Sequence, residues 1–233
     1  MNTYKFGRQP GLANAFTGVL LVMGLLCWIN VSMAQTAKPA ADDEGFVPIF
    51  DGNSLDGWTV AGPAKDAFGV EEGALVCKNP SGDDWIRTTT QYEDFILRLE
   101  YRISEGGNSG IFIRATRYGN PAYTGMEVQI LDDAGKEPDV HSSGAIYGSV
   151  APSQNASKPA GEWNSVEISC IKRQIKTVLN GIVLYDINLD DYETPLQRQT
   201  PLKFRVRKGY IGLQDHGNTV WFRNIRVKEV GEE

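Results

Sequence analysis

Residues 95–103 of this 233-residue chain read FILRLEYRI. Apolar or aromatic side chains stand at every second position: Phe95, Leu97, Leu99, Tyr101 and Ile103. Arginine and glutamate occupy the positions between Leu97 and Ile103, so one side of the segment is apolar and the other is charged. A period of two is typical of a β-strand with one face in the core and the other in solvent.

Short β-rich runs of this kind recur along the chain between 25 glycines and 11 prolines, and no helix of ordinary length is expected after residue 45. Asn180-Gly181 predicts a tight hairpin, because both turn positions need a positive φ. Many short strands with regular turns indicate one all-β domain, a sandwich or jelly roll, over residues 46–230. We expect further strands at residues 110–114, 125–131, 165–172, 175–179, 182–187, 210–214 and 220–228.

The N-terminal segment has a different composition. Lys5 and Arg8 precede an apolar run at residues 19–31, which is short for a membrane-spanning helix and has the length of a signal-peptide core. Small residues then stand at the positions that signal peptidase reads. We predict a signal peptide at residues 1–34, a flexible leader at residues 35–45, and an exported protein, periplasmic or extracellular, without stable membrane insertion after cleavage. A retained N-terminal anchor is the alternative.

Charge and cysteine content limit the partners and cross-links of the mature chain. Removing Lys5 and Arg8 leaves 21 basic against 29 acidic residues, a net charge of about −8. An acidic balance argues against nucleic acid as a partner and is compatible with a neutral small ligand such as a sugar. Cys77 and Cys170, each in a strand-like run, permit one disulfide at most, and two separately buried thiols are the other interpretation. The sequence does not define an oligomeric state.

The runs at residues 110–114 and 125–131 predict a polar face on one sheet. Alternation places the apolar residues of both runs on the core side and Arg114, Glu127 and Gln129 together on the opposite side. A solvated outer face with a surface ion pair is the structural alternative.

Two histidines, the full complement of the chain, add chemistry to this face. His141 follows the strand of Glu127, and His216 follows Gln214, each in a polar loop beside an aspartate. Loop histidines of this kind are candidates for general acid–base catalysis. No metal site is defined, although the histidines, Glu127 and nearby aspartates have the donor atoms that a divalent metal ion requires. Tyr123 and Tyr147 are candidates for stacking against sugar rings.

With these residues identified, the chain resembles the 3-keto-disaccharide hydrolase family, also described as 3-keto-glucoside lyase or hydratase domains. The resemblance extends in order across nearly all of residues 46–228. It rests on these motifs: FDGNSLDGW at residues 50–58, GGNSGIF at 106–112, EVQILD at 127–132, SSGAIYG at 142–148, KPAGEWN at 158–164, GLQDHG at 212–217 and FRNI at 222–225.

The resemblance implies a concanavalin A-like jelly roll, a sandwich of two curved antiparallel sheets with the ligand on a concave face. It also implies a carbohydrate substrate carrying a ketone at C3, whose acidified C2 proton is removed before the glycosidic oxygen leaves C1. A later hydration would complete net hydrolysis.

In that chemistry Glu127 or His216 is the expected base and His141 the alternative acid or base, while Arg114 or a divalent metal ion stabilises the enolate. The expected sugar-binding residues are Gln129, Gln214, Tyr147, Tyr123 and Asp132. A non-catalytic, lectin-like binding module is the competing function, because jelly rolls host both. Convergence of Glu127, His216 and Arg114 on one face would favour the enzyme.

Overall fold

The computed structural model describes residues 44–77, 82, 84–194 and 200–231. The expected signal peptide, and the expected leader as far as residue 43, lie outside these residues. Within the described part of the chain, no helix is long and apolar enough to cross a membrane.

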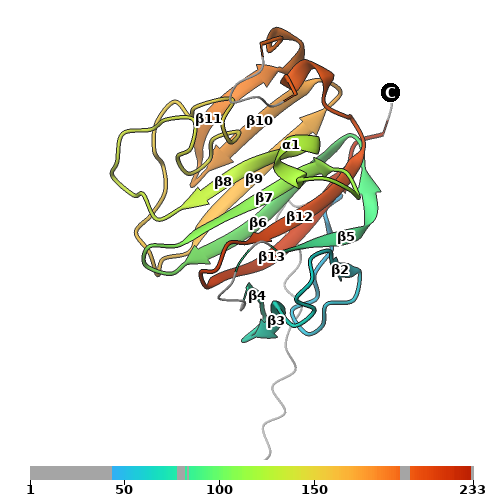
Figure 1. The fold of residues 1–233 in the computed structure, drawn as a ribbon, viewed down its shortest axis with the longest axis vertical. Helices are drawn as coiled ribbons and strands as arrows, with labels where there is room; N and C mark the ends of the chain where they lie inside the picture. The colour runs from blue at the N-terminus through green and yellow to red at the C-terminus, as the bar shows by residue number, and fades with distance from the viewer. Residues whose placement is uncertain (1–43, 78–81, 83, 195–199, 232–233) are drawn as a thin grey trace, which may run out of the picture. The chain divides into compact units, whose positions relative to one another are not determined.

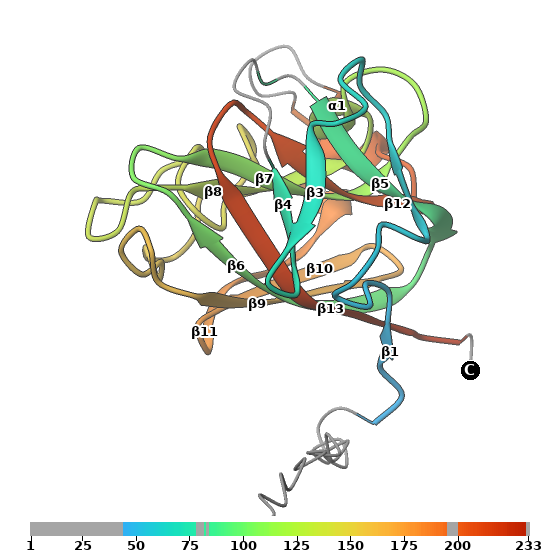
Figure 2. The ribbon, with the colours of Figure 1, turned by 90° about the horizontal axis from the view of Figure 1, so that it is seen from below.

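The described residues form two antiparallel sheets, which lie as two layers in Figures 1 and 2. The larger sheet holds eight strands: β1 (Val47–Pro48), β3 (Phe68–Glu71), β4 (Ala74–Cys77), β6 (Phe95–Ile103), β9 (Asn164–Ile171), β10 (Gln174–Leu179), β11 (Ile182–Asn188) and β13 (Val220–Glu229). The smaller sheet holds five: β2 (Trp58–Val60), β5 (Asp84–Tyr92), β7 (Asn108–Ala115), β8 (Met126–Leu131) and β12 (Gly209–Asp215). The described helical turns are α1 (Pro121–Thr124) and the 3-10 turns η2 (Leu189–Asp191) and η3 (Leu202–Phe204).

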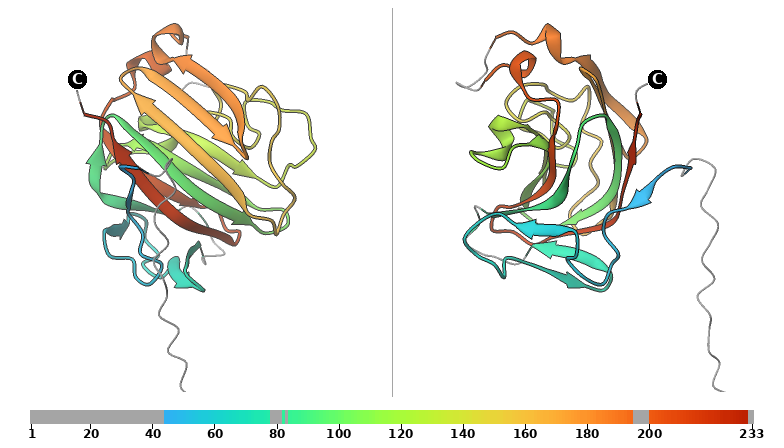
Figure 3. Two further views of the ribbon diagram at one scale, coloured as in Figure 1. Left: turned by 180° about the vertical axis from the view of Figure 1, so that it is seen from behind. Right: turned by 90° about the vertical axis from the view of Figure 1, so that its right-hand side faces the viewer.

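Strand order follows from antiparallel pairing. The larger sheet runs β11-β10-β9-β6-β13-β4-β3, with β1 pairing to the far part of β13, and the smaller sheet runs β2-β5-β12-β7-β8. Figure 3 shows the larger sheet from behind and the layering from the side. Two packed antiparallel sheets with this order confirm the predicted jelly-roll sandwich.

The strands expected from alternation are all present, with ends displaced by one or two residues. The hairpin prediction is also confirmed, because Leu179 pairs with Ile182 while Asn180 and Gly181 have φ values of 50° and 83°. The strands before residue 92 were not predicted, apart from the run around Cys77. Several of them are only two to four residues long, too short to display a period.

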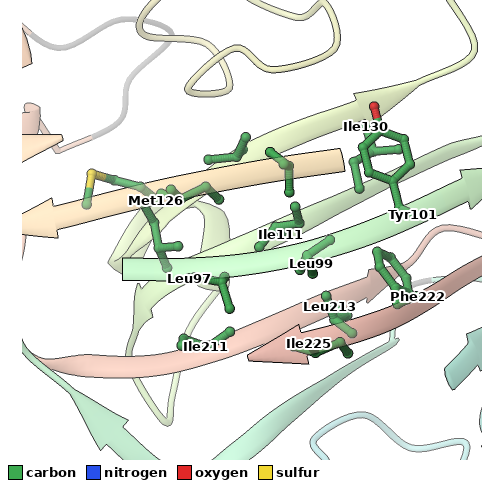
Figure 4. Close-up of a cluster of buried hydrophobic side chains, with 14 of the residues drawn as sticks. Leu97, Leu99, Tyr101, Ile111, Met126, Ile130, Ile211, Leu213, Phe222 and Ile225 are labelled. Carbon is green, nitrogen blue, oxygen red and sulfur yellow. The ribbon is translucent and has the colours of Figure 1, made fainter. Parts of the chain in front are cut away.

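The core lies between the sheets and is built from the inward positions of both (Figure 4). On β6 the buried positions are the five predicted from alternation, and on β7 and β8 they include Ile111, Met126, Val128 and Ile130. Each such side chain stabilises the fold by about 1.5–3 kcal/mol through removal of apolar surface from water. The opposite faces of these strands are therefore free to carry other chemistry.

Cys77 and Cys170 are both free and fully buried. Burial raises the pKa of the Cys170 thiol to about 12 and that of Cys77 well above its usual value. The interpretation as two separate apolar side chains is therefore confirmed over the disulfide.

Candidate functional site

A cavity of about 230 Å³ lies on the outer face of the smaller sheet, the face turned away from the core. Its floor comes from β5, β7, β8 and β12, and its walls come from α1, which lies outside the sheet in Figure 2, and from two loops. The lining residues are Asp84, Trp85, Asn108, Phe112, Asn120, Pro121, Ala122, Tyr123, Glu127, Gln129, Tyr147, Gln214, Asp215 and His216.

Strand register explains why the floor is polar. Ile111 on β7 pairs with Val128 on β8, and both side chains enter the core. The next pairs, Gly110 with Gln129 and Phe112 with Glu127, must then face outward, because successive side chains alternate between the faces of a sheet. The prediction that Glu127 and Gln129 share an outer face is confirmed.

Glu127 carries the unusual electrostatics of the cavity. The residue is 3% exposed, and none of the described residues donates a hydrogen bond to its Oε1. Desolvation raises the pKa of this carboxyl to about 8, because burial disfavours the charged form. A carboxyl that titrates near neutral pH can both accept and return a proton, which suits a general acid–base catalyst.

Two tyrosines border the same space. The segment at residues 144–147 runs along β8, where the Gln129 amide donates to the Ala145 carbonyl at 3.0 Å and the Tyr147 amide donates to the Glu127 carbonyl at 2.9 Å. This pairing places Tyr147 beside Glu127. Burial raises the pKa of the Tyr147 phenol, and the neighbouring Tyr123 and Glu127 raise it further. The Tyr147 phenol is therefore a neutral hydrogen-bond donor near the carboxyl at ordinary pH.

Amides and aromatic rings form the remainder of the floor. Gln129 Nε2 donates to Asn108 Oδ1 at 3.0 Å. Gln214 Oε1 is buried and accepts no hydrogen bond from the described residues. Trp85 and Phe112 pack edge to face with their ring centroids 5.6 Å apart, which gives the cavity an apolar wall.

Buried Arg205 holds the α1 wall in place. Its Nη1 donates to the Ala122 carbonyl at 3.0 Å and to the Gly125 carbonyl, and its Nε donates to the Thr200 carbonyl at 2.8 Å. Desolvation lowers the pKa of this guanidinium to about 10, so it remains charged at neutral pH. Arg205 thereby ties α1 to the segment that precedes β12.

The placement predicted for Arg114 is wrong. Arg114 has a φ of 52° and lies where the β7–β12 register shifts, so its side chain leaves the outward alternation. It is fully buried and donates to the Glu93 carbonyl at 2.7 Å and to the Lys172 carbonyl at 2.9 Å, with Asp94 Oδ1 at 3.2 Å. Arg114 links the turn between β5 and β6, which joins the two sheets, to the β9–β10 hairpin turn, and it does not line the cavity.

The two histidines occupy different positions. His216 is exposed and lines the cavity, whereas His141 does not. The His141 ring packs against Tyr147 with centroids 5.1 Å apart, and its Nδ1 is 3.9 Å from Asp139 Oδ1. His141 therefore contacts Tyr147 and lies outside the cavity lining. This position does not support the expected contact between His141 and the substrate.

Asp132 also lies away from the cavity, contrary to the expectation that it binds the sugar. Its Oδ2 accepts from the Gly106 amide at 2.8 Å, and its own amide donates to the Gly107 carbonyl at 3.0 Å. Because both contacts brace the turn before β7, Asp132 has a structural position.

Several lining residues were not predicted from the sequence. Asp84 and Asp215 lie opposite each other on β5 and β12 and are 2% and 1% exposed. Asp215 Oδ1 accepts from the Gly217 amide at 3.0 Å, and Asp84 Oδ1 from the Ala64 amide at 3.3 Å. Asp215 and Asn108 fall inside quoted motifs, which was the available signal. Asp84 had no such signal, because it lies outside all of these motifs.

The cavity combines the Glu127 carboxyl, whose pKa is raised to about 8, with two further carboxyls and with hydrogen-bond donors and acceptors. Of the described residues that line it, none is Lys or Arg, so an anion formed here would be stabilised by neutral donors or by His216. No group of three or more His, Cys, Asp or Glu side chains among the described residues is arranged to hold a metal ion. Glu127 and His216 do converge on one cavity, while Arg114 does not.

Comparison with known proteins gives consistent results. Residues 45–228 match the sequence profile of a family described as the 3-keto-alpha-glucoside-1,2-lyase-like domain. The chain is 31% identical to a 3-keto-disaccharide hydrolase of Bacteroides thetaiotaomicron, over 86% of this chain and 86% of that protein.

Two solved structures agree with the fold. A candidate glycosyl hydrolase from Parabacteroides distasonis is 27% identical, with a TM-score of 0.70 over 79% of this chain and 99% of that one. A Bacillus subtilis protein of unknown function with a galectin-like fold is 11% identical, with a TM-score of 0.52 over 77% of this chain and 92% of that one. The second likeness concerns the fold alone.

Proposed function

The chain belongs to the 3-keto-alpha-glucoside-1,2-lyase-like domain family, and from this membership we propose that it cleaves 3-keto-glycosides in the cavity above the smaller sheet. The name of the Bacteroides relative, a 3-keto-disaccharide hydrolase, supports a sugar substrate of this kind. The observation that carries the proposal is the buried carboxyl of Glu127, which has no hydrogen bond to Oε1 from the described residues and a pKa raised to about 8.

Glu127 is the proposed base. A ketone at C3 acidifies the proton on C2, and the Glu127 carboxylate removes that proton to form an enolate between C2 and C3. Because its pKa is close to neutral, the carboxylate is a stronger base than an ordinary glutamate and is still partly ionised at the working pH. Expulsion of the glycosidic oxygen from C1 then gives a 2-hydroxy-3-keto-glucal and a free alcohol.

The other lining groups complete the step. His216 is the proposed acid that protonates the departing oxygen, since it lines the cavity and is exposed at its edge. Tyr147 and Gln129 supply the donors for enolate charge, the role first expected of Arg114. Gln214 and Tyr123 orient the sugar. Addition of water across C1 and C2 of the glucal returns a proton to C2 and yields the free 3-keto sugar, so the net reaction is hydrolysis.

Deuterium incorporation tests this route. Purified protein is incubated in D₂O with a 3-keto-glucoside, with and without a chelator, and sugar release and C2 deuteration are followed by NMR. Elimination followed by hydration places deuterium at C2 of the released sugar, whereas direct displacement at C1 leaves that position protonated. Free 3-keto-glucose incubated alongside corrects for uncatalysed exchange.

The same experiment separates the enzyme from a binding module. Saturable binding of a 3-keto-glucoside without release or C2 exchange would mean that the cavity only binds sugar. The aromatic wall of Trp85 and Phe112 is the observation that favours this second function.

We further propose that the protein is exported, on the basis of the N-terminal pattern. Expression in a Gram-negative host followed by N-terminal sequencing of the periplasmic fraction tests it. A mature chain beginning at Gln35 is the expected result, and an uncut chain in the cytoplasm would contradict it.

A further inference from the structure

Gly110 lies on β7 in a row of outward positions whose other members line the cavity. Trp85 pairs with Gln214, and Gly110 pairs with Gln129. Since Leu213 pairs with Ile111, Gly110 is the next residue along β7 and lies opposite Gln214. Four outward-facing residues therefore form a row across the sheet. Three of them have large side chains, and Gly110 has none.

The Glu127 carboxyl fills the space that a side chain at position 110 would take. A Cβ atom built on Gly110 would lie 2.1 Å from Glu127 Oε1, 2.7 Å from its Cγ and 2.8 Å from its Cδ. The carboxyl thus lies across the bare backbone of the neighbouring strand. A real Cβ is not found at such distances, so Glu127 and any side chain at 110 exclude each other in this arrangement.

Backbone conformation does not account for the glycine. The φ of Gly110 lies outside the positive range, so an L-residue can adopt this conformation without strain. Glycine inside a strand is unfavourable, because it loses more conformational freedom on folding and packs no side chain. The structural advantage of glycine here is the space that it leaves for the carboxyl.

We propose that Gly110 is a positioning residue, whose missing side chain seats the Glu127 carboxyl flat against β7 and holds it there for reaction. The catalytic consequence rests on the proposed function, whereas the seating itself does not. In this seat the carboxyl is shielded from water by the sheet, and Tyr147 lies beside it. The other titratable groups that line the cavity are Tyr123, Asp84, Asp215 and His216.

Gly212 provides a matched control on the adjacent strand. It also faces outward, but a Cβ there would lie 2.6 Å from the ring of Trp85 rather than near Glu127. Gly212→Ala and Gly110→Ala therefore introduce the same methyl group into the same floor, with different neighbours.

A double-mutant cycle in stability tests the seating without any substrate. Denaturant unfolding is measured for wild type, Gly110→Ala, Glu127→Ala and the double variant. Gly110→Ala should raise the unfolding constant at least about tenfold when Glu127 is present, because side chains in contact couple. In the Glu127→Ala background the same methyl should be neutral, or lower that constant about two- to fivefold, as alanine does at unstrained glycine positions. Equal effects in both backgrounds would refute the seat.

Kinetic measurements test the catalytic consequence of this position of the Glu127 carboxyl. Displacing the carboxyl should lower kcat of Gly110→Ala by about 10²-fold with little change in KM, as small misplacements of reacting groups do. The pH midpoint of kcat/KM should move toward acid, because the displaced carboxyl regains water. Gly212→Ala should leave that midpoint unchanged. Activity of Gly110→Ala within twofold of wild type, or an unmoved midpoint, would overturn the positioning role.

The two experiments fail separately. If wild-type protein does not turn over a 3-keto-glucoside, the proposed function falls, and the stability cycle still decides whether Gly110 seats Glu127. If wild type is active but the cycle shows no coupling, the seat is wrong while the function stands.

Discussion

The outer faces of the two sheets carry similar sequences of alternating polar residues but have different electrostatics. On the larger sheet, Arg98 Nε lies 2.7 Å from Glu167 Oε2, and Arg223 Nε lies 2.7 Å from Glu100 Oε2. These side chains remain partly exposed, so each charge is both paired and hydrated. On the smaller sheet, Glu127 is buried under loops and α1, and its Oε1 receives no hydrogen bond from the described residues.

The aromatic residues at the cavity also differ from those on the outer face of the larger sheet. On the larger sheet, the Arg223 guanidinium lies 3.8 Å from the centroid of Trp163, and that of Arg102 lies 4.3 Å from the centroid of Trp221. On the smaller sheet, Trp85 packs against Phe112 at the cavity wall. On the larger sheet, Glu100 and Glu167 are paired with arginines, whereas on the smaller sheet Glu127 Oε1 and Gln214 Oε1 accept no hydrogen bond from the described residues. Because a buried acceptor without a partner costs stability, this difference supports the proposal that the functional site lies on the smaller sheet.

Replacing Glu127 tests the contrast with the largest expected effect. Glu127→Gln keeps the shape of the side chain and removes its basicity, so kcat on a 3-keto-glucoside should fall by about 10⁴-fold. Glu100→Gln on the other face is the matched control and should retain full activity. Comparable activity of Glu127→Gln and wild type would remove Glu127 from the mechanism.

The pH dependence of stability gives the next largest effect. The Glu127 pKa is raised from 4.5 to about 8 in the folded protein, so folding retains a proton that the unfolded chain has released. Wild type should therefore lose stability as pH rises from about 4.5 to 8, with an upper bound of roughly 5 kcal/mol at about 1.4 kcal/mol per pKa unit.

Glu127→Gln does not titrate and escapes this loss. Its free energy of unfolding should match that of wild type near pH 4.5 and exceed it by about 2–4 kcal/mol at pH 9. Denaturant titrations at the two pH values measure the difference. A constant difference would mean that the carboxyl is not desolvated.

Alternation in the sequence was sufficient to predict the sandwich and the outward direction of Glu127 and Gln129. It failed at Arg114, because a residue with positive φ shifts the strand register, and nothing in the local sequence indicates that. The burial of Glu127 could not be predicted from alternation either. The loop around Tyr147 pairs with β8, and the turn of α1 is held in place by the distant Arg205, so the cover over Glu127 depends on long-range contacts. Alternation alone therefore could not distinguish Glu127 from Glu100 or Glu167, and only the family resemblance did so.

Replacing Arg205 tests how the α1 wall of the cavity is held in position. Arg205→Met removes the donors that hold the Ala122, Gly125 and Thr200 carbonyls, and the unfolding free energy should fall by about 2 kcal/mol. Because Ala122 and Tyr123 line the cavity, KM should rise about tenfold while kcat changes less than twofold. An unchanged KM in a folded variant would show that α1 does not depend on Arg205 for its position.

The smallest expected effect comes from the outer face of the larger sheet, where the charged side chains are paired. Glu167→Gln breaks the ion pair with Arg98. The side chain of Glu167 is 33% exposed and that of Arg98 is 22% exposed. A pair of this exposure contributes at most about 1 kcal/mol, because water screens the attraction and ordering two long side chains costs entropy. The free energy of unfolding should fall by less than about 1 kcal/mol, the loss should shrink further in high salt, and turnover should not change. A larger loss, or one insensitive to salt, would mean that the two faces are less different than their burial indicates.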